Sequence, residues 1–206
     1  VAYRIALEPT RRAWLPALDY LVDWPTELTR RGRALQLMLG EPGEGRAVTQ
    51  RFEYALRSYP DARLAPSGLA LTVRSRNLGL PAERHPRTRA LAAELRAAAA
   101  DDRDYIARVL QRFATDGYAY TLEPPPLGAD PVDEFLFDTR EGFCEHYASS
   151  FAVLLRAGGI PTRVVTGYQG GEFNAYGGYL LVRQSTAHAW NEVWLPGSGW
   201  TRVDPT

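Results

Sequence analysis

The stretch "TREGFCEHYASSFAVLLRAGG", residues 139–159, decides the fold, because it places the only cysteine of the chain at the start of a helical pattern. Within it, apolar residues recur every three or four positions, which is the spacing of one face of an α-helix: Phe143, Tyr147, Phe151, Leu154 and Leu155. Gly158 and Gly159 are typical of a helix end. The pattern predicts a helix over 144–159 that carries Cys144 in its first turn.

Segments typical of β-strands follow this helix, with glycine-rich turns between them. In one of them the alternate residues His188, Trp190, Glu192 and Trp194 share a face. A helix followed by strands with short turns predicts an α+β fold, in which the cysteine-bearing helix packs on an antiparallel sheet. Four strands are predicted, within residues 162–170, 177–184, 185–195 and 199–206.

The N-terminal part of the chain has a different pattern, which favours a β-rich module. Short apolar segments alternate or nearly alternate between prolines, such as Val1–Leu7, Val48–Leu56 and Leu69–Arg76. From Pro86 the pattern becomes helical, and Asp101 or Asp102 can cap a second helix. We therefore expect two domains, a β-rich module at 1–82 and a core of helices and strands at 83–206.

Charge and hydropathy exclude two classes of function. The 24 basic and 24 acidic residues cancel, so we expect no general attraction to nucleic acid. No run of 18 apolar residues occurs, so we expect this stretch to be soluble by itself and not to span a membrane. The sequence leaves the oligomeric state open.

Cys144 has three possible roles: buried filler, metal ligand or nucleophile. A structural zinc site needs about four Cys or His ligands, and the chain has one cysteine and three histidines. Because calcium-binding and glycine-rich phosphate motifs are also missing, we expect no metal and no cofactor. In the first turn of a helix, free N–H groups and the helix dipole favour negative charge, and the thiolate is the reactive form of cysteine. Its position therefore favours a nucleophile.

A nucleophilic thiolate needs a base, and the three histidines are the candidates. His85 lies in the proline-flanked segment "ERHPRT", which favours a surface position. His146 is two residues from Cys144, a spacing that points the two side chains apart on a helix, so we expect a structural role. His188, on a predicted strand, is left as the base.

Asp204 is the expected partner of His188. It follows the turn "PGSG" (196–199), and a hairpin folded about this turn brings the two residues close together. A carboxylate there fixes the tautomer of the imidazole and stabilises its charged form. Cys144, His188 and Asp204 therefore form a candidate thiol triad.

Three segments resemble the core of the transglutaminase-like superfamily: "GFCEHYASSFAVLLRAGGIPTRVVTGY", "AHAWNEVWL" and "GWTRVDPT". The chain is also similar to the bacterial TgpA-type branch, through "YTLEPPPLG" and "FLFDTREGFCEHYA". The resemblance implies a papain-like fold in which Cys144 is the nucleophile, His188 the base and Asp204 its orienter. It also implies a full-length chain anchored by membrane helices, of which this part is the periplasmic domain of an inner-membrane protein.

The activity that the resemblance implies is transfer of an acyl group from a protein glutamine to a primary amine, through a thioester on Cys144. The partners are then protein or peptide substrates that supply the glutamine and the amine. A cysteine hydrolase of the cell envelope shares this chemistry and is the alternative, and a non-enzymatic binding module is a third reading. All basic residues are arginine, which fits either a GC-rich genome or an enzyme that avoids linking its own lysines.

The oxyanion formed in such a reaction needs hydrogen-bond donors. The backbone N–H of Cys144 is one candidate. The second is a side chain, either Tyr118 or Tyr120 upstream of the helix or the indole of Trp190. For each of these aromatic residues, packing is the competing role.

Overall fold

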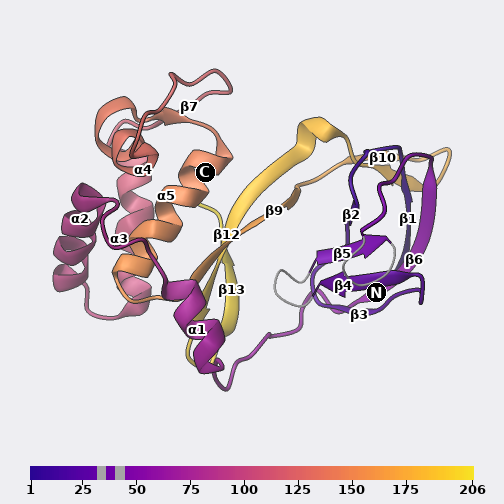
Figure 1. Ribbon diagram of the computed structural model, residues 1–206, viewed down its shortest axis with the longest axis horizontal. Coiled ribbons are helices and arrows are strands. Elements are labelled where there is room, and N and C mark those ends of the chain that lie inside the picture. The colour runs from indigo at the N-terminus through magenta and orange to yellow at the C-terminus, as the bar shows by residue number, and fades with distance from the viewer. Residues whose placement is uncertain (32–35, 40–44) are drawn as a thin grey trace. The chain divides into compact units, whose positions relative to one another are not determined.

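The computed structural model describes residues 1–31, 36–39 and 45–206 (Figure 1). Contacts between Cα atoms divide the chain into two compact units, Val1–Leu64 and Ala65–Thr206. This division falls before the boundary predicted at 82/83, so residues 65–82 belong to the same unit as the cysteine-bearing helix. Within the described ranges, no helix has the length and apolar character needed to cross a membrane.

Among the described residues, the first unit consists of antiparallel strands in two three-stranded sheets, with the orders β1-β6-β3 and β2-β5-β4. Leucine side chains, Val48 and Tyr54 form its core. The β-rich character predicted for the start of the chain is confirmed, although the strand expected at Val48–Leu56 begins at Phe52. The strands are β1 (Ala2–Leu7), β2 (Trp14–Leu15), β3 (Leu21–Asp23), β4 (Leu28–Arg31), β5 (Gln36–Leu39) and β6 (Phe52–Ser58).

The second unit contains all the segments that were predicted to carry chemistry. Its helices are α1 (Leu71–Leu78), α2 (Pro86–Ala98), α3 (Asp102–Thr115), α4 (Pro131–Glu134), the π-helix η1 (Phe135–Thr139), α5 (Cys144–Ala157) and the 3-10 helix η2 (Gln184–Thr186). Its strands are β7 (Ala119–Tyr120), β8 (Glu141–Gly142), β9 (Thr162–Tyr168), β10 (Glu172–Asn174), β11 (Tyr179–Leu181), β12 (Ala187–Leu195) and β13 (Gly199–Val203).

The strand predicted at Leu69–Arg76 is wrong, because this segment forms the helix α1. The N–H of Arg74 donates to the carbonyl of Ala70 at 2.9 Å. Asn77, one turn after Val73, donates from Nδ2 to the Val73 carbonyl at 2.8 Å. The apolar run in this segment is too short to separate a period of two from a period of 3.6.

Helix α5 begins at Cys144, as predicted, and is the central element of the second unit. It contacts β12 and β9 of the sheet, and it also contacts α2 and α3 (Figure 1). Phe151, Leu154 and Leu155 are fully buried in this packing. Burial of one such side chain contributes about 1.5–3 kcal/mol of stability, so the apolar stripe of the helix fixes where Cys144 stands.

The main sheet is antiparallel with the order β13-β12-β9, and β12 lies in its centre. The strand predicted within residues 177–184 is not part of it, since β11 pairs with β10 in a separate hairpin. The side chains of β11 are exposed, including Tyr179 and Leu180, which point to opposite faces. Without a buried face, nothing fixes this strand to the sheet edge.

Candidate active site

Cys144 is the first residue of α5 and is only 7% exposed. The N–H of Phe143 donates to Nδ1 of His146 at 3.3 Å, so His146 closes the first turn of the helix, in agreement with its expected structural role. Cys144 packs in one cluster with Ala148 of the same helix and Ala189 of β12. Because Ala189 directly follows His188, this contact joins the thiol-bearing turn to the start of β12.

The structure brings His188 and Asp204 together. Nε2 of His188 lies 2.7 Å from Oδ2 of Asp204. The register of the hairpin explains the contact: β12 and β13 pair from Leu195 with Gly199 back to Asn191 with Val203, and Asp204 follows directly. Asp204 therefore lies just beyond the last β12–β13 pair, next to the residues at the start of β12.

The carboxylate of Asp204 is held in its ionised form. Partial burial alone raises its pKa, but hydrogen bonds from Thr206 and His188 outweigh burial and bring the pKa below its usual value. Its other oxygen, Oδ1, accepts from the hydroxyl of Thr206 at 2.7 Å. An ionised acceptor requires the proton on Nε2 of His188, so Nδ1 is the nitrogen left to exchange a proton.

The indole of Trp190 lies between His188 and an arginine. Its ring is stacked with the imidazole of His188, with 6.3 Å between the ring centroids and an angle of 20° between the planes. The guanidinium of Arg202 also lies over the indole, with Cζ 4.1 Å from the centre of the ring. Trp190 is thus a packing element that sets the plane of the imidazole.

Gly167 of β9 pairs directly with His188 across the sheet. A Cβ atom added to this glycine would lie 2.8 Å from Cη2 of Trp190, closer than carbon atoms approach in proteins. The absence of a side chain at this position therefore makes room for the indole beside the histidine.

A buried side chain also ties α5 to the sheet. Nδ2 of Asn191, on β12, donates to the carbonyl of Ala148 at 2.9 Å. Asn191 is fully buried, so the loss of this hydrogen bond would leave buried polar atoms without a partner. The helix and strand that carry Cys144 and His188 are joined by this contact as well as by apolar packing.

Tyr120 is placed beside the thiol by a short parallel bridge. In this bridge β7 pairs with β8, Tyr120 opposite Gly142, which is two residues before Cys144. Partial burial raises the pKa of Tyr120; hydrogen bonding to the Cys144 backbone lowers it, and negative charge on Cys144 and Asp204 raises it further. The hydroxyl of Tyr120 therefore lies within electrostatic range of both Cys144 and Asp204, while its side chain stays 54% exposed.

Tyr118 lies elsewhere, inside the helical core. Its hydroxyl donates to the carbonyl of Leu136 at 2.7 Å, and its ring packs against Phe113 and Phe135. Burial raises the pKa of Tyr118, which keeps the phenol neutral. Of the two tyrosines considered from the sequence, the structure favours Tyr120 as a group that can act on substrate.

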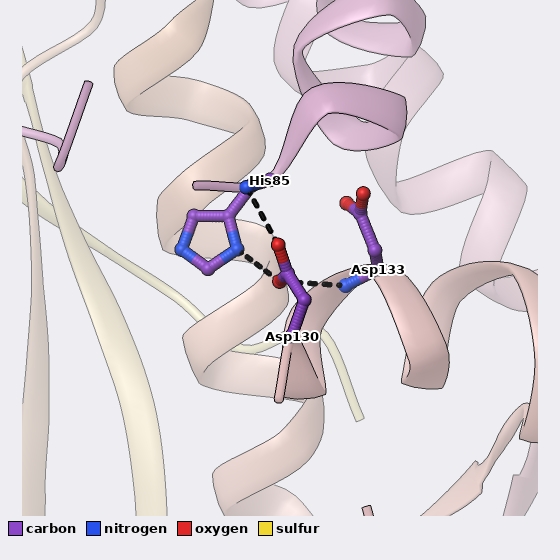
Figure 2. A group of neighbouring side chains, drawn as sticks. All are labelled: His85, Asp130 and Asp133. Carbon is purple, nitrogen blue, oxygen red and sulfur yellow. Dashed lines mark hydrogen bonds and ion pairs between the residues drawn. The ribbon is translucent and has the colours of Figure 1, made fainter. Parts of the chain in front are cut away.

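His85 is buried, so its predicted surface position is wrong (Figure 2). Its N–H donates to Oδ2 of Asp130 at 2.7 Å, and its Nδ1 lies 2.5 Å from Oδ1 of the same carboxylate. Asp133 accepts from the N–H groups of Arg87 and Thr88, at 2.9 Å and 3.0 Å. The proline beside His85 marks the first turn of α2, and His85 and Thr88 at this turn are buried where α2 packs on α4.

His85, Asp130 and Asp133 offer atoms within 4.8 Å of one another, a spacing that a metal ion could bridge. Each oxygen of the two carboxylates, however, already accepts from an N–H or O–H group. Helix N-termini need such acceptors, because their first N–H groups have no partner within the helix. We therefore interpret the cluster as a cap that joins α2 to α4.

Sequence reasoning missed two residues of the site, Arg202 and Gly167. Arg202 is two residues before Asp204, so the alternation of side chains along β13 could have placed both on one face. A glycine inside a strand is often a point of close approach, and this signal was available for Gly167.

Comparisons with known proteins found a family model, two relatives and solved structures that match this chain. The family model described as the transglutaminase-like superfamily matches residues 89–205. Over 204 residues the chain is 50% identical to a protein-glutamine gamma-glutamyltransferase of Pseudomonas aeruginosa. The matched region is 99% of this chain and 30% of that protein. Over 160 residues it is 32% identical to the uncharacterized protein YebA of Bacillus subtilis, covering 74% of this chain and 22% of that protein.

A solved structure is similar over the same range. The crystal structure of the periplasmic domain of TgpA from Pseudomonas aeruginosa has a TM-score of 0.89 and 48% identity, and the match covers 99% of this chain and 68% of that one. The predicted α+β transglutaminase-core fold and the TgpA-type resemblance are therefore confirmed. The chain spans less than a third of the length of the two relatives matched by sequence.

Proposed function

Because the chain belongs to the transglutaminase-like superfamily, we propose that it transfers the acyl group of a protein glutamine to a primary amine, with Cys144, His188 and Asp204 as its triad. The observation that carries the proposal is the 2.7 Å hydrogen bond between His188 and Asp204, beside the strand residue that packs on Cys144. The 50% identity to a protein-glutamine gamma-glutamyltransferase supports acyl transfer as the reaction.

In the first half of the reaction, Sγ of Cys144 attacks Cδ of the glutamine, and the thiol proton passes to Nδ1 of His188. The carbonyl oxygen becomes an oxyanion. Its collapse breaks the C–N bond, and the departing ammonia takes the proton from His188, which leaves a thioester on Cys144. Asp204 stays ionised throughout and stabilises the imidazolium that exists between the two proton transfers.

In the second half, a primary amine attacks the thioester carbon and gives its proton to Nδ1 of His188. The C–S bond breaks, the proton returns to the sulfur, and the product is a secondary amide. If water attacks the thioester in place of the amine, the product is glutamate, and the protein then acts as a hydrolase. The two reactions differ only in the second nucleophile, so the triad serves both.

The oxyanion is bound, in this proposal, by the N–H of Cys144 and the hydroxyl of Tyr120. Two features support this pair: the phenol interacts with both the backbone and the thiol of Cys144, and the pKa of Tyr120 is raised, first by partial desolvation, so that its oxygen keeps the proton. A donor that hydrogen-bonds to the carbonyl oxygen only when negative charge develops on it stabilises the transition state more than the bound substrate. Trp190 is left with the packing role described above.

We place this activity in the periplasm, as part of a protein of the inner membrane. Similarity to the solved periplasmic domain of TgpA supports this location. The natural substrates would then be proteins or peptides of the cell envelope that present a glutamine and an amine.

The test uses the 206-residue chain with casein as glutamine donor and a fluorescent primary amine. We expect fluorescence bound to casein and release of ammonia, and neither with Cys144→Ala or His188→Ala. The enzyme has no lysine, so it offers no lysine amine that could compete with the fluorescent amine. Ammonia release with neither bound fluorescence nor cross-linked casein would instead establish hydrolysis, and activity that survives Cys144→Ala would refute the mechanism.

A further inference from the structure

Arg202 is the cationic group that stands beside the His188–Asp204 pair. Its Nη2 lies 3.9 Å from Oδ2 of Asp204, the same oxygen that binds His188. Its guanidinium also stacks on the indole of Trp190, which in turn stacks on His188. The side-chain oxygen of Gln169, at the end of β9, accepts from Nη2 at 2.9 Å and fixes this position.

We propose that Arg202 is a positioning residue, which holds Trp190 against the imidazole of His188 and sets, through its charge, the pH range in which the triad works. The proposal rests on the proposed function of Cys144, His188 and Asp204. It adds a residue that touches neither the substrate nor the sulfur.

The packing part of the proposal follows from the planar shape of the guanidinium. A planar guanidinium can lie flat on the face of an indole, as Arg202 does on Trp190, whereas a lysine ammonium is a compact point charge. The indole is also confined by Gly167, where there is no space for a Cβ atom. Arg202 on its face and Gly167 close to its ring both restrict the position of Trp190, and Trp190 in turn restricts the plane of the imidazole that stacks on it.

The electrostatic part follows from the charges around His188. Asp204, just after β13, binds His188, and Arg202 of β13 lies beside that carboxylate. Cys144 at the start of α5 packs on Ala189, the neighbour of His188, and the phenol of Tyr120 on β7 responds to Cys144 and Asp204. Arg202 is the positive member of this set. A nearby cation favours the thiolate and disfavours the imidazolium, so its loss moves both limbs of a bell-shaped pH profile to higher pH.

The size of this shift can be worked out from the distances. Since Arg202 and His188 both lie close to Oδ2 of Asp204, the two cationic groups are within about 7 Å of each other, and their repulsion at the dielectric constant of water corresponds to roughly half a pH unit. Salt screens a charge that is 45% exposed, as the Arg202 side chain is, so the shift shrinks at high ionic strength.

The experiment compares kcat/KM against pH for the wild type, Arg202→Met and Arg202→Lys, in the amine-incorporation assay. For Arg202→Met we expect a fall of about tenfold in kcat/KM and a shift to higher pH, of about half a pH unit for the limb that reports the imidazolium. The limb that reports the thiolate should move in the same direction. Arg202→Lys keeps the charge, so we expect the limbs of the wild type with a smaller loss of kcat/KM. In about 0.5 M salt the wild-type limbs should move toward those of Arg202→Met.

Arg87→Met is the matched control. The Arg87 side chain is 49% exposed, stacks on Phe137 at 4.5 Å and pairs with Asp138 at 2.8 Å, but it lies at the start of α2. It should leave the pH profile unchanged. A wild-type profile and kcat/KM for Arg202→Met would overturn the proposal while leaving the function intact, provided that Cys144→Ala is inactive. If Arg202→Met does not fold, the wild type alone can test the proposal: a pH profile of kcat/KM that does not change with salt would also overturn it.

Discussion

Replacement of Gly167 by alanine tests whether Trp190 controls the histidine. The new Cβ would lie 2.8 Å from Cη2 and 3.3 Å from Cζ3 of the indole. Carbon atoms normally approach to about 3.5–4.0 Å, so the indole has to move by roughly 1 Å. Gly167 is not among the glycines with positive φ, so the backbone accepts alanine and the effect is purely steric.

The displacement of the indole should lower both the stability and the kcat/KM of the protein. Overpacking a well-packed site costs about 1–3 kcal/mol, which for a chain of this size lowers Tm by about 3–10 °C. His188 stacks on the displaced ring, and a misplacement of about 1 Å can reduce catalysis by about 100-fold. We therefore expect a modest loss of stability and a much larger loss of kcat/KM.

The assay is amine incorporation into casein, with Tm measured on the same samples. Gly79→Ala is the control, because its Cβ would meet only ordinary contacts of 3.4 Å and 3.5 Å and its φ is −61°. In Gly167→Ala combined with Trp190→Phe, the smaller ring leaves space for the methyl group, so activity should not fall below that of Trp190→Phe alone. Wild-type kcat/KM and Tm for Gly167→Ala would show that Trp190 does not control the position of His188.

Three further predictions address the other contacts of the second unit. Asp204→Asn should reduce kcat by about 10⁴-fold, because an amide no longer holds the proton on Nε2 of His188; pH-rate profiles and Tm separate this from unfolding. Tyr120→Phe should reduce kcat by about 100-fold with little change in KM, as expected for an oxyanion donor, and an unchanged kcat contradicts that role. Burial alone raises the pKa of Asp130, but hydrogen bonds from His85 bring it below its usual value, so its contribution to stability is complete above about pH 4 and is lost as pH falls further. Asp130→Asn should thus cost about 1.5 kcal/mol at pH 7 and less near pH 2, as measured by urea unfolding.

The parts of the fold that the sequence predicts well are those with a long and regular apolar pattern. Helix α5 begins at Cys144 as expected, and Asp101 caps α3 by accepting from the N–H of Asp104 at 2.8 Å. The approach of Asp204 to His188 could also be anticipated, because one tight turn joins their strands. In each case the deciding information is local.

The remaining features depend on contacts between distant residues. Nothing near His85 indicates that a carboxylate 45 residues later binds it, so a loop position was the natural interpretation. The register between β9 and β12, which places Gly167 opposite His188, is fixed by packing against α5 and not by either strand alone. The choice between Tyr118 and Tyr120 likewise needs the parallel bridge of β7 and β8.

The hydrogen bond from the side-chain amide of Asn191 limits which substitutions this protein can accept without a loss of activity. It holds the helix that starts with the thiol to the strand that starts with the imidazole. A substitution that repacks this contact, even a stabilising one, moves the sulfur relative to the imidazole. Heat-resistant variants selected for retained activity should therefore accumulate their changes away from Asn191, in surface positions and in the separate unit Val1–Leu64.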